Sequence, residues 1–137
     1  MKWLYRNLYR KKKGFTLVEL MVVIIILAVL TAIAVPSYMA LRNRARTAAA
    51  QSEMKNIATA LELYNADKDA YPATTFAAMK TAIETGKYMV SVPTKDPWGV
   101  NYVYTLATGT YTLTSYGPNG VAGTDDIVII NGQLQGI

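Results

Sequence analysis

The stretch GFTLVELMVVIIILAVLTAIAVP, residues 14–36, decides the architecture of this 137-residue chain. Residues 20–35 are sixteen in number, and only Thr31 among them is polar. As a helix, residues 15–35 measure about 31 Å, near the thickness of a bilayer core. One carboxylate, Glu19, stands at the start of this run, although a carboxylate in hydrocarbon costs about 2.5 kcal/mol or more. The stretch therefore predicts a membrane-spanning helix in which Glu19 needs a partner.

Charge is distributed unevenly along the chain. Residues 1–14 hold six Lys and Arg and no acid, whereas the other 123 residues hold eight basic and nine acidic side chains. The basic cluster before the apolar run predicts a cytoplasmic N-terminus and a translocated C-terminal part. Because the basic character lies in the first segment, the overall charge of +5 is no argument for nucleic-acid binding, and no nucleic-acid partner is expected.

The sequence contains neither Cys nor His. This excludes disulfides, thiolate nucleophiles, His-based triads and nearly all zinc sites. Any metal site must be built from oxygen ligands, which favours a hard cation.

Two interpretations of the apolar run come from the residues alone. A secretory signal would end at a small-residue cleavage site, which residues 32–34 (Ala-Ile-Ala) imitate only weakly. A plain single-span anchor explains the hydrophobicity but leaves Glu19 and the Gly14–Phe15 junction unexplained.

A third interpretation rests on resemblance, because residues 13–19, KGFTLVE, closely resemble the processing motif of type IV pilins and type II secretion pseudopilins. The resemblance implies that a prepilin peptidase removes the leader, residues 1–14, by cutting after Gly14. The same enzyme would methylate the new N-terminal amine of Phe15. Residues 15–36 would remain as the transmembrane and filament-core helix. Glu19 would then meet the N-terminal amine of a neighbouring subunit during assembly; the alternative is a carboxylate that extends to the membrane interface.

Residues 37–66 contain no Gly or Pro and predict that the helix resumes after a kink at Pro36 and ends near residue 66. Helical spacing gives it one apolar face that packs on a sheet, formed by Met54, Ile57, Leu61 and Tyr64. Arg42, Arg44 and Arg46 follow the apolar run. A solvated, subunit-facing surface is their expected role, with a nucleic-acid or lipid contact as the alternative.

Shorter elements follow in residues 67–137. Thr74 or Thr75 caps a short helix that ends at Gly86 and whose apolar face is Phe76, Met79 and Ile83. Residues 96–99, Asp-Pro-Trp-Gly, form a tight turn, and Trp98 is expected under the sheet. Strands are expected at residues 100–106, 110–115, 127–130 and 133–135, the last two joined by Asn131-Gly132. The fold class is α+β, a long N-terminal helix packed on a small antiparallel sheet, with residues 37–137 as the amphipathic helix and globular domain.

The loop at residues 116–126 holds three glycines, a proline and two adjacent carboxylates. Calcium accepts six to eight oxygens from carboxylates, amides and backbone carbonyls in irregular geometry. The loop therefore predicts a Ca²⁺ site, although a polar turn is the alternative. The candidate ligands are the side chains of Asn119, Thr124, Asp125 and Asp126 and the backbone carbonyls of Tyr116 and Val121.

The same part of the chain resembles the major pseudopilin of type II secretion. The similar segments are residues 96–99, Tyr102 and Tyr104, residues 111–120, and Asp126-Ile127. The resemblance implies calcium in this loop, bound by a carbonyl and Asp side chains. This sequence departs from the family pattern at Asn119, where the family usually carries Asp. One negative charge is therefore lost, and a lower affinity for calcium is expected.

The resemblance also implies the function, a structural subunit of a helical filament anchored in the bacterial inner membrane. As a major pseudopilin it would form a periplasmic pseudopilus for type II secretion, together with copies of itself, an inner-membrane assembly platform and minor pseudopilins. The alternative is a type IV pilin of surface fibres; the missing cysteines disfavour it, because many such pilins have a C-terminal disulfide. No enzymatic activity is expected, since no nucleophile accompanies Asp125 and Asp126.

Overall fold

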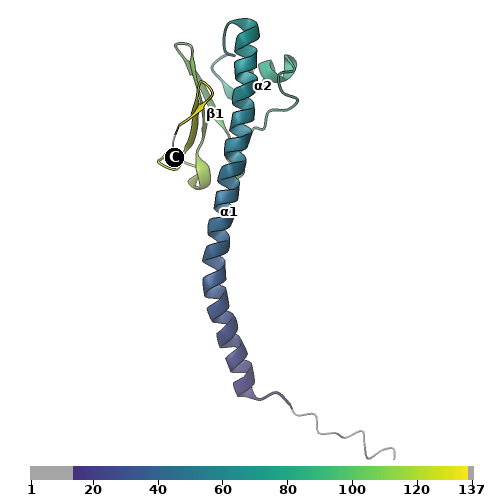
Figure 1. Cartoon of the computed structure of the whole chain (residues 1–137), viewed down its shortest axis with the longest axis vertical. Coiled ribbons are helices and arrows are strands. Elements are labelled where there is room, and N and C mark those ends of the chain that lie inside the picture. Colours follow the sequence, from purple (N-terminus) through teal and green to yellow (C-terminus); the bar gives the residue numbers. More distant parts are fainter. Residues whose placement is uncertain (1–13, 136–137) are drawn as a thin grey trace, which may run out of the picture. The chain divides into compact units, whose positions relative to one another are not determined.

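The computed structural model describes residues 14–135, so the predicted leader, apart from Gly14, lies outside the described residues. The elements follow the order helix, helix, four strands (Figure 1). Their bounds are α1 (Leu17–Lys68), α2 (Phe76–Thr85), β1 (Val103–Ala107), β2 (Thr110–Ser115), the 3-10 helix η2 (Gly117–Asn119), β3 (Ile127–Ile130) and β4 (Gln133–Leu134). The chain divides into two compact units, Met1–Ala40 and Leu41–Ile137.

The described part of the first unit is helical from Leu17 onward and exposed throughout. Thr31 and Ser37 donate their hydroxyls to backbone carbonyls one turn earlier, Leu27 O at 2.7 Å and Ile33 O at 3.1 Å, so neither hydroxyl is left unpaired in an apolar environment. The helical assignment continues through Pro36 without a break. By length and composition α1 contains a segment able to cross a membrane.

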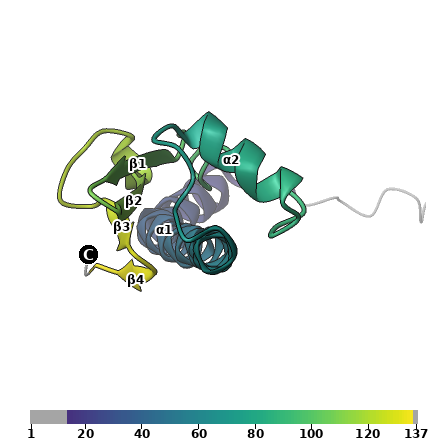
Figure 2. The same cartoon turned by 90° about the horizontal axis from the view of Figure 1, so that it is seen from above.

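The second unit has its own hydrophobic core, built on one face of the C-terminal half of α1 (Figure 2). Met54, Ile57 and Leu61 are fully buried and Tyr64 is half-buried, as their spacing predicts. Tyr111, Leu113, Ile127 and Ile129 fill the facing side of the sheet. Burying a side chain of this size is worth about 1.5–3 kcal/mol, so this helix–sheet interface supplies much of the stability of the unit.

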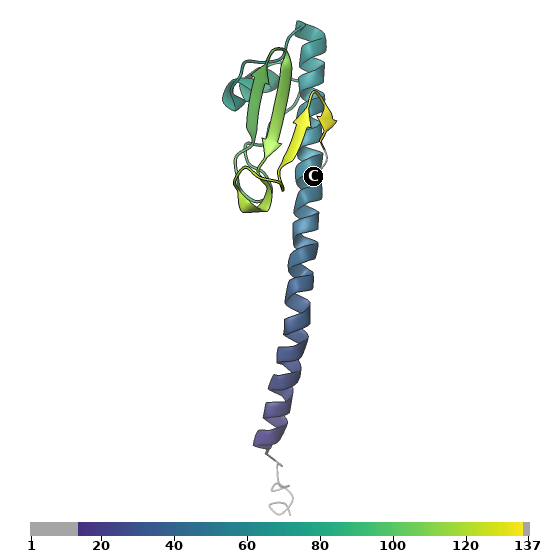
Figure 3. The ribbon, with the colours of Figure 1, turned by 90° about the vertical axis from the view of Figure 1, so that its left-hand side faces the viewer.

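The four strands form one antiparallel sheet in the order β1-β2-β3-β4 (Figure 3). The predicted bounds of β2 and β3 are confirmed, and Asn131 and Gly132 form the predicted hairpin turn with φ of 44° and 76°. β1 begins three residues later than predicted. Residues 100–102 pair backward instead, since Tyr102 N donates to Thr94 O at 3.1 Å and Lys95 bridges Asn101.

The short helix and the tight turn also form where the sequence places them. Thr75 caps α2 by accepting a hydrogen bond from Ala78 N at 3.3 Å, and Gly86 ends it with its N–H on Ala82 O. Gly99 N donates to Asp96 O at 2.9 Å, closing the turn at residues 96–99. Trp98 packs against the core as predicted, and its buried Nε1 makes no hydrogen bond within the described part of the chain.

Candidate functional site

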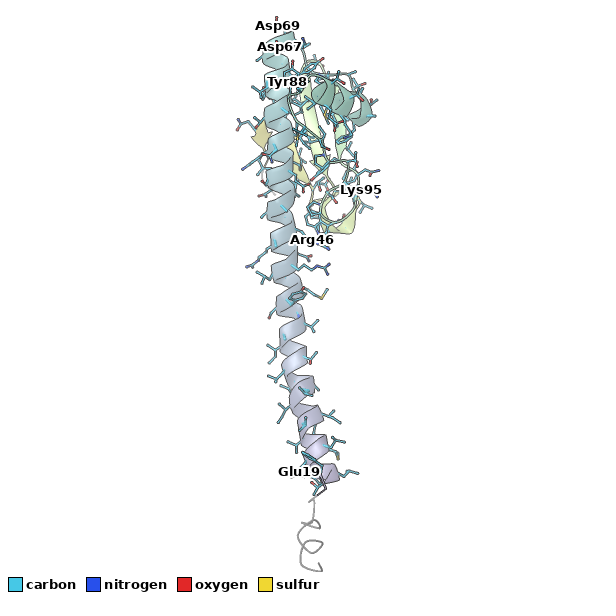
Figure 4. The ribbon with its side chains drawn as sticks, turned by 90° about the vertical axis from the view of Figure 1, so that its right-hand side faces the viewer. Glu19, Arg46, Asp67, Asp69, Tyr88 and Lys95 are labelled. Atoms are coloured by element: carbon cyan, nitrogen blue, oxygen red, sulfur yellow. The ribbon has the colours of Figure 1, made fainter. Side chains whose placement is uncertain are left out.

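Glu19 lies at the start of α1 (Figure 4). It forms a reciprocal cap with Thr16. Its Oε2 accepts hydrogen bonds from Thr16 N at 2.8 Å and Thr16 Oγ1 at 2.9 Å, while Glu19 N donates to Thr16 Oγ1 at 3.2 Å. This is a capping box, which satisfies helix N–H groups that otherwise lack a partner. The carboxylate therefore has a local partner in the full-length chain, and Gly14 and Phe15 precede it in exposed, non-helical backbone.

Exposed apolar side chains precede and follow Glu19 in the sequence. Every residue from 14 to 45 is exposed in the single chain. The large apolar side chains among them include Phe15 at 88 % and Leu17 at 74 % exposure. A soluble monomer rarely exposes so long an apolar surface, so a membrane or other apolar helices must cover it.

The predicted calcium loop lies between β2 and β3 and is held by three glycine backbones. Gly117 has φ of 65° and approaches Asp125 so closely that a Cβ there would lie 2.7 Å from Asp125 O. Gly120 is also left-handed, with φ of 70°, and ends η2. Gly123 N donates to Asp126 Oδ1 at 3.1 Å, which closes the end of the loop.

Three of the candidate ligands converge beside Gly123. A Cβ on Gly123 would lie 3.3 Å from Asp125 Oδ1, 3.6 Å from Asn119 Nδ2 and 3.8 Å from Val121 O. Asn119 Nδ2 donates to Asp125 Oδ1 at 2.6 Å, and Asn119 Oδ1 accepts from Val121 N at 2.8 Å. Presenting Oδ1 to the same point would require rotating the Asn119 amide by half a turn, and a bound cation would then have to replace both of these hydrogen bonds.

A calcium ion in this loop would require amide and carbonyl oxygens in addition to the carboxylates. Within residues 14–135 no three acidic side chains gather in a way that would hold a metal. Asn119, Val121, Asp125 and Asp126 share the loop contacts, whereas the hydrogen bonds of the described residues do not involve the Tyr116 or Thr124 side chains. Calcium accepts mixed oxygen sets of this kind.

A buried carboxylate links the start of this loop to the tight turn. Asp96 is 5 % exposed, and its Oδ1 accepts from Trp98 N at 3.0 Å and Val100 N at 2.9 Å. Its Oδ2 accepts from Ser115 Oγ at 2.7 Å, and Ser115 Oγ accepts from Gly117 N at 3.3 Å. Three donors satisfy the buried charge, and the chain of bonds fixes where the loop begins.

Tyrosine–carboxylate bonds tie the rest of the second unit to α1. Tyr102 OH donates to Glu53 Oε2 at 2.7 Å, and burial, reinforced by Glu53, raises the pKa of Tyr102. Burial likewise raises the pKa of Tyr71, whose hydroxyl donates to Glu62. At the end of α1, Tyr88 OH donates to Asp67 Oδ2 at 2.5 Å and lowers the pKa of that carboxyl (Figure 4).

Two features of these sites were missing from the sequence prediction. The Thr16–Glu19 capping box was visible as the pattern T-x-x-E, so the sequence held the signal. The Asp96–Ser115 bond joins residues 19 positions apart and left no local signal.

The family follows from comparison with known proteins. A family model described as type II secretion system (T2SS), protein G matches residues 37–131, more than half of the chain. The chain belongs to the type II secretion system protein G family. A second model, the prokaryotic N-terminal methylation motif, matches residues 9–35, and this motif implies processing by a prepilin peptidase. The resemblance noted in the sequence is thereby confirmed.

Individual relatives agree with this assignment. The type II secretion system core protein G of Pseudomonas aeruginosa is 37 % identical over 132 residues, covering 85 % of this chain and 91 % of that protein. The protein of the same name from Escherichia coli is 35 % identical over 130 residues, covering 85 % and 88 %. The crystal structure of the major pseudopilin from the type 2 secretion system of enterohaemorrhagic Escherichia coli matches with a TM-score of 0.50 and 24 % identity, covering 66 % of this chain and 90 % of that one. That match supports the α+β fold.

Proposed function

We propose that this chain is the major pseudopilin of a type II secretion system, a structural subunit that polymerises into a periplasmic pseudopilus. The observation that carries the proposal is the apolar N-terminal helix, which is exposed in the single chain. The chain itself belongs to a family named for this system. The bilayer covers the helix before assembly, and the helices of neighbouring copies cover it afterwards. The role is structural rather than catalytic.

Processing precedes assembly in this proposal. Prepilin peptidase cuts after Gly14 and methylates the amine of Phe15, which leaves residues 15–36 as the anchor in the bacterial inner membrane. The N-terminus lies in the cytoplasm before cleavage and the globular domain lies in the periplasm. The exposed, non-helical backbone at residues 14–16 supports cleavage after Gly14, because a peptidase needs an extended segment. The further partners are the inner-membrane assembly platform and the minor pseudopilins.

The Glu19 carboxylate pairs with the N-terminal amine of a neighbouring subunit. Glu19→Ala does not test this pairing by itself, because it removes the charge and the helix cap together. Glu19→Gln keeps the cap, because Glu and Gln both serve in a capping box, and removes only the charge. Thr16→Ala is the matched control, since it weakens the cap and keeps the charge.

If charge pairing drives assembly, Glu19→Gln blocks filament formation while leaving leader cleavage intact, and Thr16→Ala assembles. The measurement is the yield of sheared filaments beside the ratio of cleaved to uncleaved chain on an immunoblot. Normal filaments from Glu19→Gln would contradict the charge role; loss of filaments from Thr16→Ala alone would show that the cap is what matters.

The secretion role is tested by deleting the gene and following two readouts in one strain. Loss of secreted enzymes from the culture supernatant with surface filaments intact supports the pseudopilin. Loss of surface filaments with secretion intact would instead make the chain a type IV pilin. Re-expressing the chain must restore whichever readout is lost.

The loop at residues 116–126 holds a calcium ion in this proposal, and the convergence of Asn119, Val121 and Asp125 beside Gly123 supports it. Asp125 and Asp126 supply negative charge, Asn119 and Thr124 supply side-chain oxygen, and Tyr116 and Val121 supply carbonyls. The ion would cross-link the loop where no disulfide exists. At a free calcium concentration of 100 times the Kd, binding stabilises the folded state by about 2.7 kcal/mol.

A calcium titration of the full-length chain in detergent, followed by thermal unfolding, tests the site. At about 4–8 °C per kcal/mol, saturation should raise Tm by about 10 °C or more, and a chelator should reverse the shift. Asp125→Asn should abolish the shift, and Asn119→Asp should make it appear at lower calcium. Asp69→Asn, an exposed carboxylate outside the loop, is the control. An unchanged Tm in the wild-type chain would refute the site.

A further inference from the structure

Three arginines follow the apolar run of α1 and have no partner inside the described structure. Arg42 and Arg44 are exposed, and Arg46, which is labelled in Figure 4, is half-buried. Within residues 14–135 the ion pairs are Lys68–Asp67 and Lys80–Glu84, and neither involves an arginine. No acidic residue occurs between Glu19 and Glu53, so the helix itself offers these arginines no carboxylate three or four residues away, the spacing at which side chains on a helix pair.

The spacing of the arginines around the helix identifies the kind of partner. At 100° per residue, Arg42 and Arg46 lie about 40° apart, and Arg44 lies about 160° from both. Arg44 therefore lies on the side of α1 opposite Arg42 and Arg46, so the three residues do not form a stripe along one face. A protein docked on a helix contacts one face, whereas a lipid headgroup layer surrounds the helix on all sides.

The spacing along the helix axis matches the same partner. Arg42 and Arg46 are about 6 Å apart along the axis, close to the depth of one headgroup layer. Residues 20–41 carry no charge and as a helix measure about 33 Å, slightly more than a hydrocarbon core of about 30 Å. Charged residues thus bound the apolar segment at a separation of one bilayer core.

The residues just before the arginines have the chemistry of a membrane interface. Tyr38, Met39 and Leu41 are exposed at 66 %, 59 % and 67 %. Tyrosine is enriched where the hydrocarbon meets the headgroups, and arginine side chains near the end of a span extend toward phosphate. The guanidinium group binds phosphate oxygens through two parallel hydrogen bonds.

We propose that Arg42, Arg44 and Arg46 bind the headgroups of anionic phospholipids in the leaflet at the C-terminal end of the membrane span, and so hold the unassembled subunit at a fixed depth. This rests on the proposed membrane anchoring of α1. Leaving the membrane for a filament then requires these lipid contacts to be exchanged for other partners. Each basic residue near an anionic surface contributes about 1 kcal/mol, which corresponds to about a fivefold preference per arginine.

The test measures lipid selectivity around the full-length chain. The chain is reconstituted in phosphatidylcholine vesicles with spin-labelled phosphatidylglycerol or spin-labelled phosphatidylcholine as the probe, and the ratio of their association constants is read from the motionally restricted fraction. Arg42→Gln/Arg44→Gln/Arg46→Gln is compared with Lys55→Gln/Lys87→Gln/Lys95→Gln, which removes the same charge from exposed positions elsewhere in the second unit. The basic leader is present in all of these proteins, so the comparison isolates the arginines.

The ratio should fall at least about fivefold in the arginine variant and stay at the wild-type value in the lysine variant. Replacing the three arginines by lysine, which keeps the charge, should retain most of the preference. Inorganic phosphate, compared with sodium chloride at equal ionic strength, should not reduce the ratio, because a free anion does not replace a lipid layer; a specific reduction would assign the arginines to free phosphate and overturn the proposal. Flotation of the vesicles shows separately that the chain is inserted, so failed anchoring is distinguished from failed selectivity.

An unchanged ratio in the arginine variant would overturn the proposal. If that variant kept its lipid preference and lost cross-linking between copies in the membrane, the arginines would contact a second copy of the chain instead.

Discussion

Replacing Asp96 should destabilise the second unit more than replacing any of its exposed carboxylates does. Asp96→Ala leaves three donors without their acceptor, the buried hydroxyl of Ser115 and the half-buried N–H groups of Trp98 and Val100. Each stranded donor costs about 1–3 kcal/mol, so the expected loss is at least about 3 kcal/mol. For a domain of this size that corresponds to a fall in Tm of about 12 °C or more.

Asp96→Asn separates the charge from the geometry. Its amide oxygen can still accept from Trp98 and Val100, but its NH₂ group meets the Ser115 hydroxyl, which then needs another acceptor for its own hydrogen. One hydrogen bond to a charged group is lost, at a cost of about 1.5–3 kcal/mol. The Asn variant should therefore lie between wild type and Asp96→Ala.

The assay is denaturant unfolding of the full-length chain in detergent, followed by near-ultraviolet circular dichroism of the aromatic core. A double-mutant cycle of Asp96→Asn with Ser115→Ala should give an interaction energy of about 0.5–3 kcal/mol, because the two side chains share a hydrogen bond. Asp69→Asn, which is exposed and lies outside this network, is the control. Equal stability of Asp96→Ala and the control would refute the reasoning, and strict additivity in the cycle would refute the link through Ser115.

Three further predictions concern the core, the loop and alkaline pH. Leu61→Ala should cost about 2–5 kcal/mol in unfolding free energy, whereas Leu63→Ala, two positions away and 53 % exposed, should change it little; similar losses would contradict the buried face of α1. Gly117→Ala should destabilise more than Gly109→Ala, because both glycines have positive φ but only the Cβ at position 117 meets backbone, 2.7 Å from Asp125 O; equal losses in thermal unfolding would contradict the close approach. Burial raises the pKa of Tyr104 to about 12, above its ordinary value of about 10, so the stability from its protonated phenol is complete below pH 10 and is lost as pH rises toward 12. Because other tyrosines also contribute tyrosinate absorbance, the measurement is the difference in absorbance between the wild-type chain and Tyr104→Phe; a difference that appears at about pH 10 without unfolding would contradict this.

The fold could be predicted from sequence where its determinants are local. The helical period places Met54, Ile57 and Leu61 on one buried face, Thr75 caps α2, and Asn131-Gly132 forces a hairpin turn, so these elements were found. The start of β1 was wrong because residues 100–102 pair with residues 94–96, and an alternating pattern does not say which neighbour a strand takes. The bonds from Tyr102 to Glu53 and from Ser115 to Asp96 span 49 and 19 residues, and such distant partners leave no periodic signal.

The candidate sites divide in the same way. Gly14, Phe15 and Glu19 lie in one contiguous motif, so the sequence identified the motif, and the family comparison confirmed it. The candidate calcium ligands are selected by side-chain chemistry alone, and the structure brings atoms of Asn119, Val121 and Asp125 within 4 Å of the position that a Cβ on Gly123 would occupy. The sequence shows which side chains could act as ligands. Whether these side chains come together depends on the backbone conformation of the loop.

The core-facing carboxylates of the second unit have hydrogen-bond partners inside the fold, whereas its three arginines have none among the described residues. This difference indicates that the carboxylates stabilise the fold and that the arginines bind a partner outside it. Leu41–Ile137 holds eight basic and eight acidic side chains, so charge balance alone would allow many internal ion pairs. The carboxylates that face the core take hydroxyl and amide donors instead, Tyr102 for Glu53, Tyr71 for Glu62 and Ser115 for Asp96. Neutral donors stabilise a carboxylate without requiring a second buried charge, which limits the desolvation cost. Among the basic residues, Lys68 pairs with Asp67 and Lys80 with Glu84, whereas the three arginines that follow the apolar run make no ion pair within residues 14–135. These arginines are therefore the basic groups best placed to meet a membrane or another subunit.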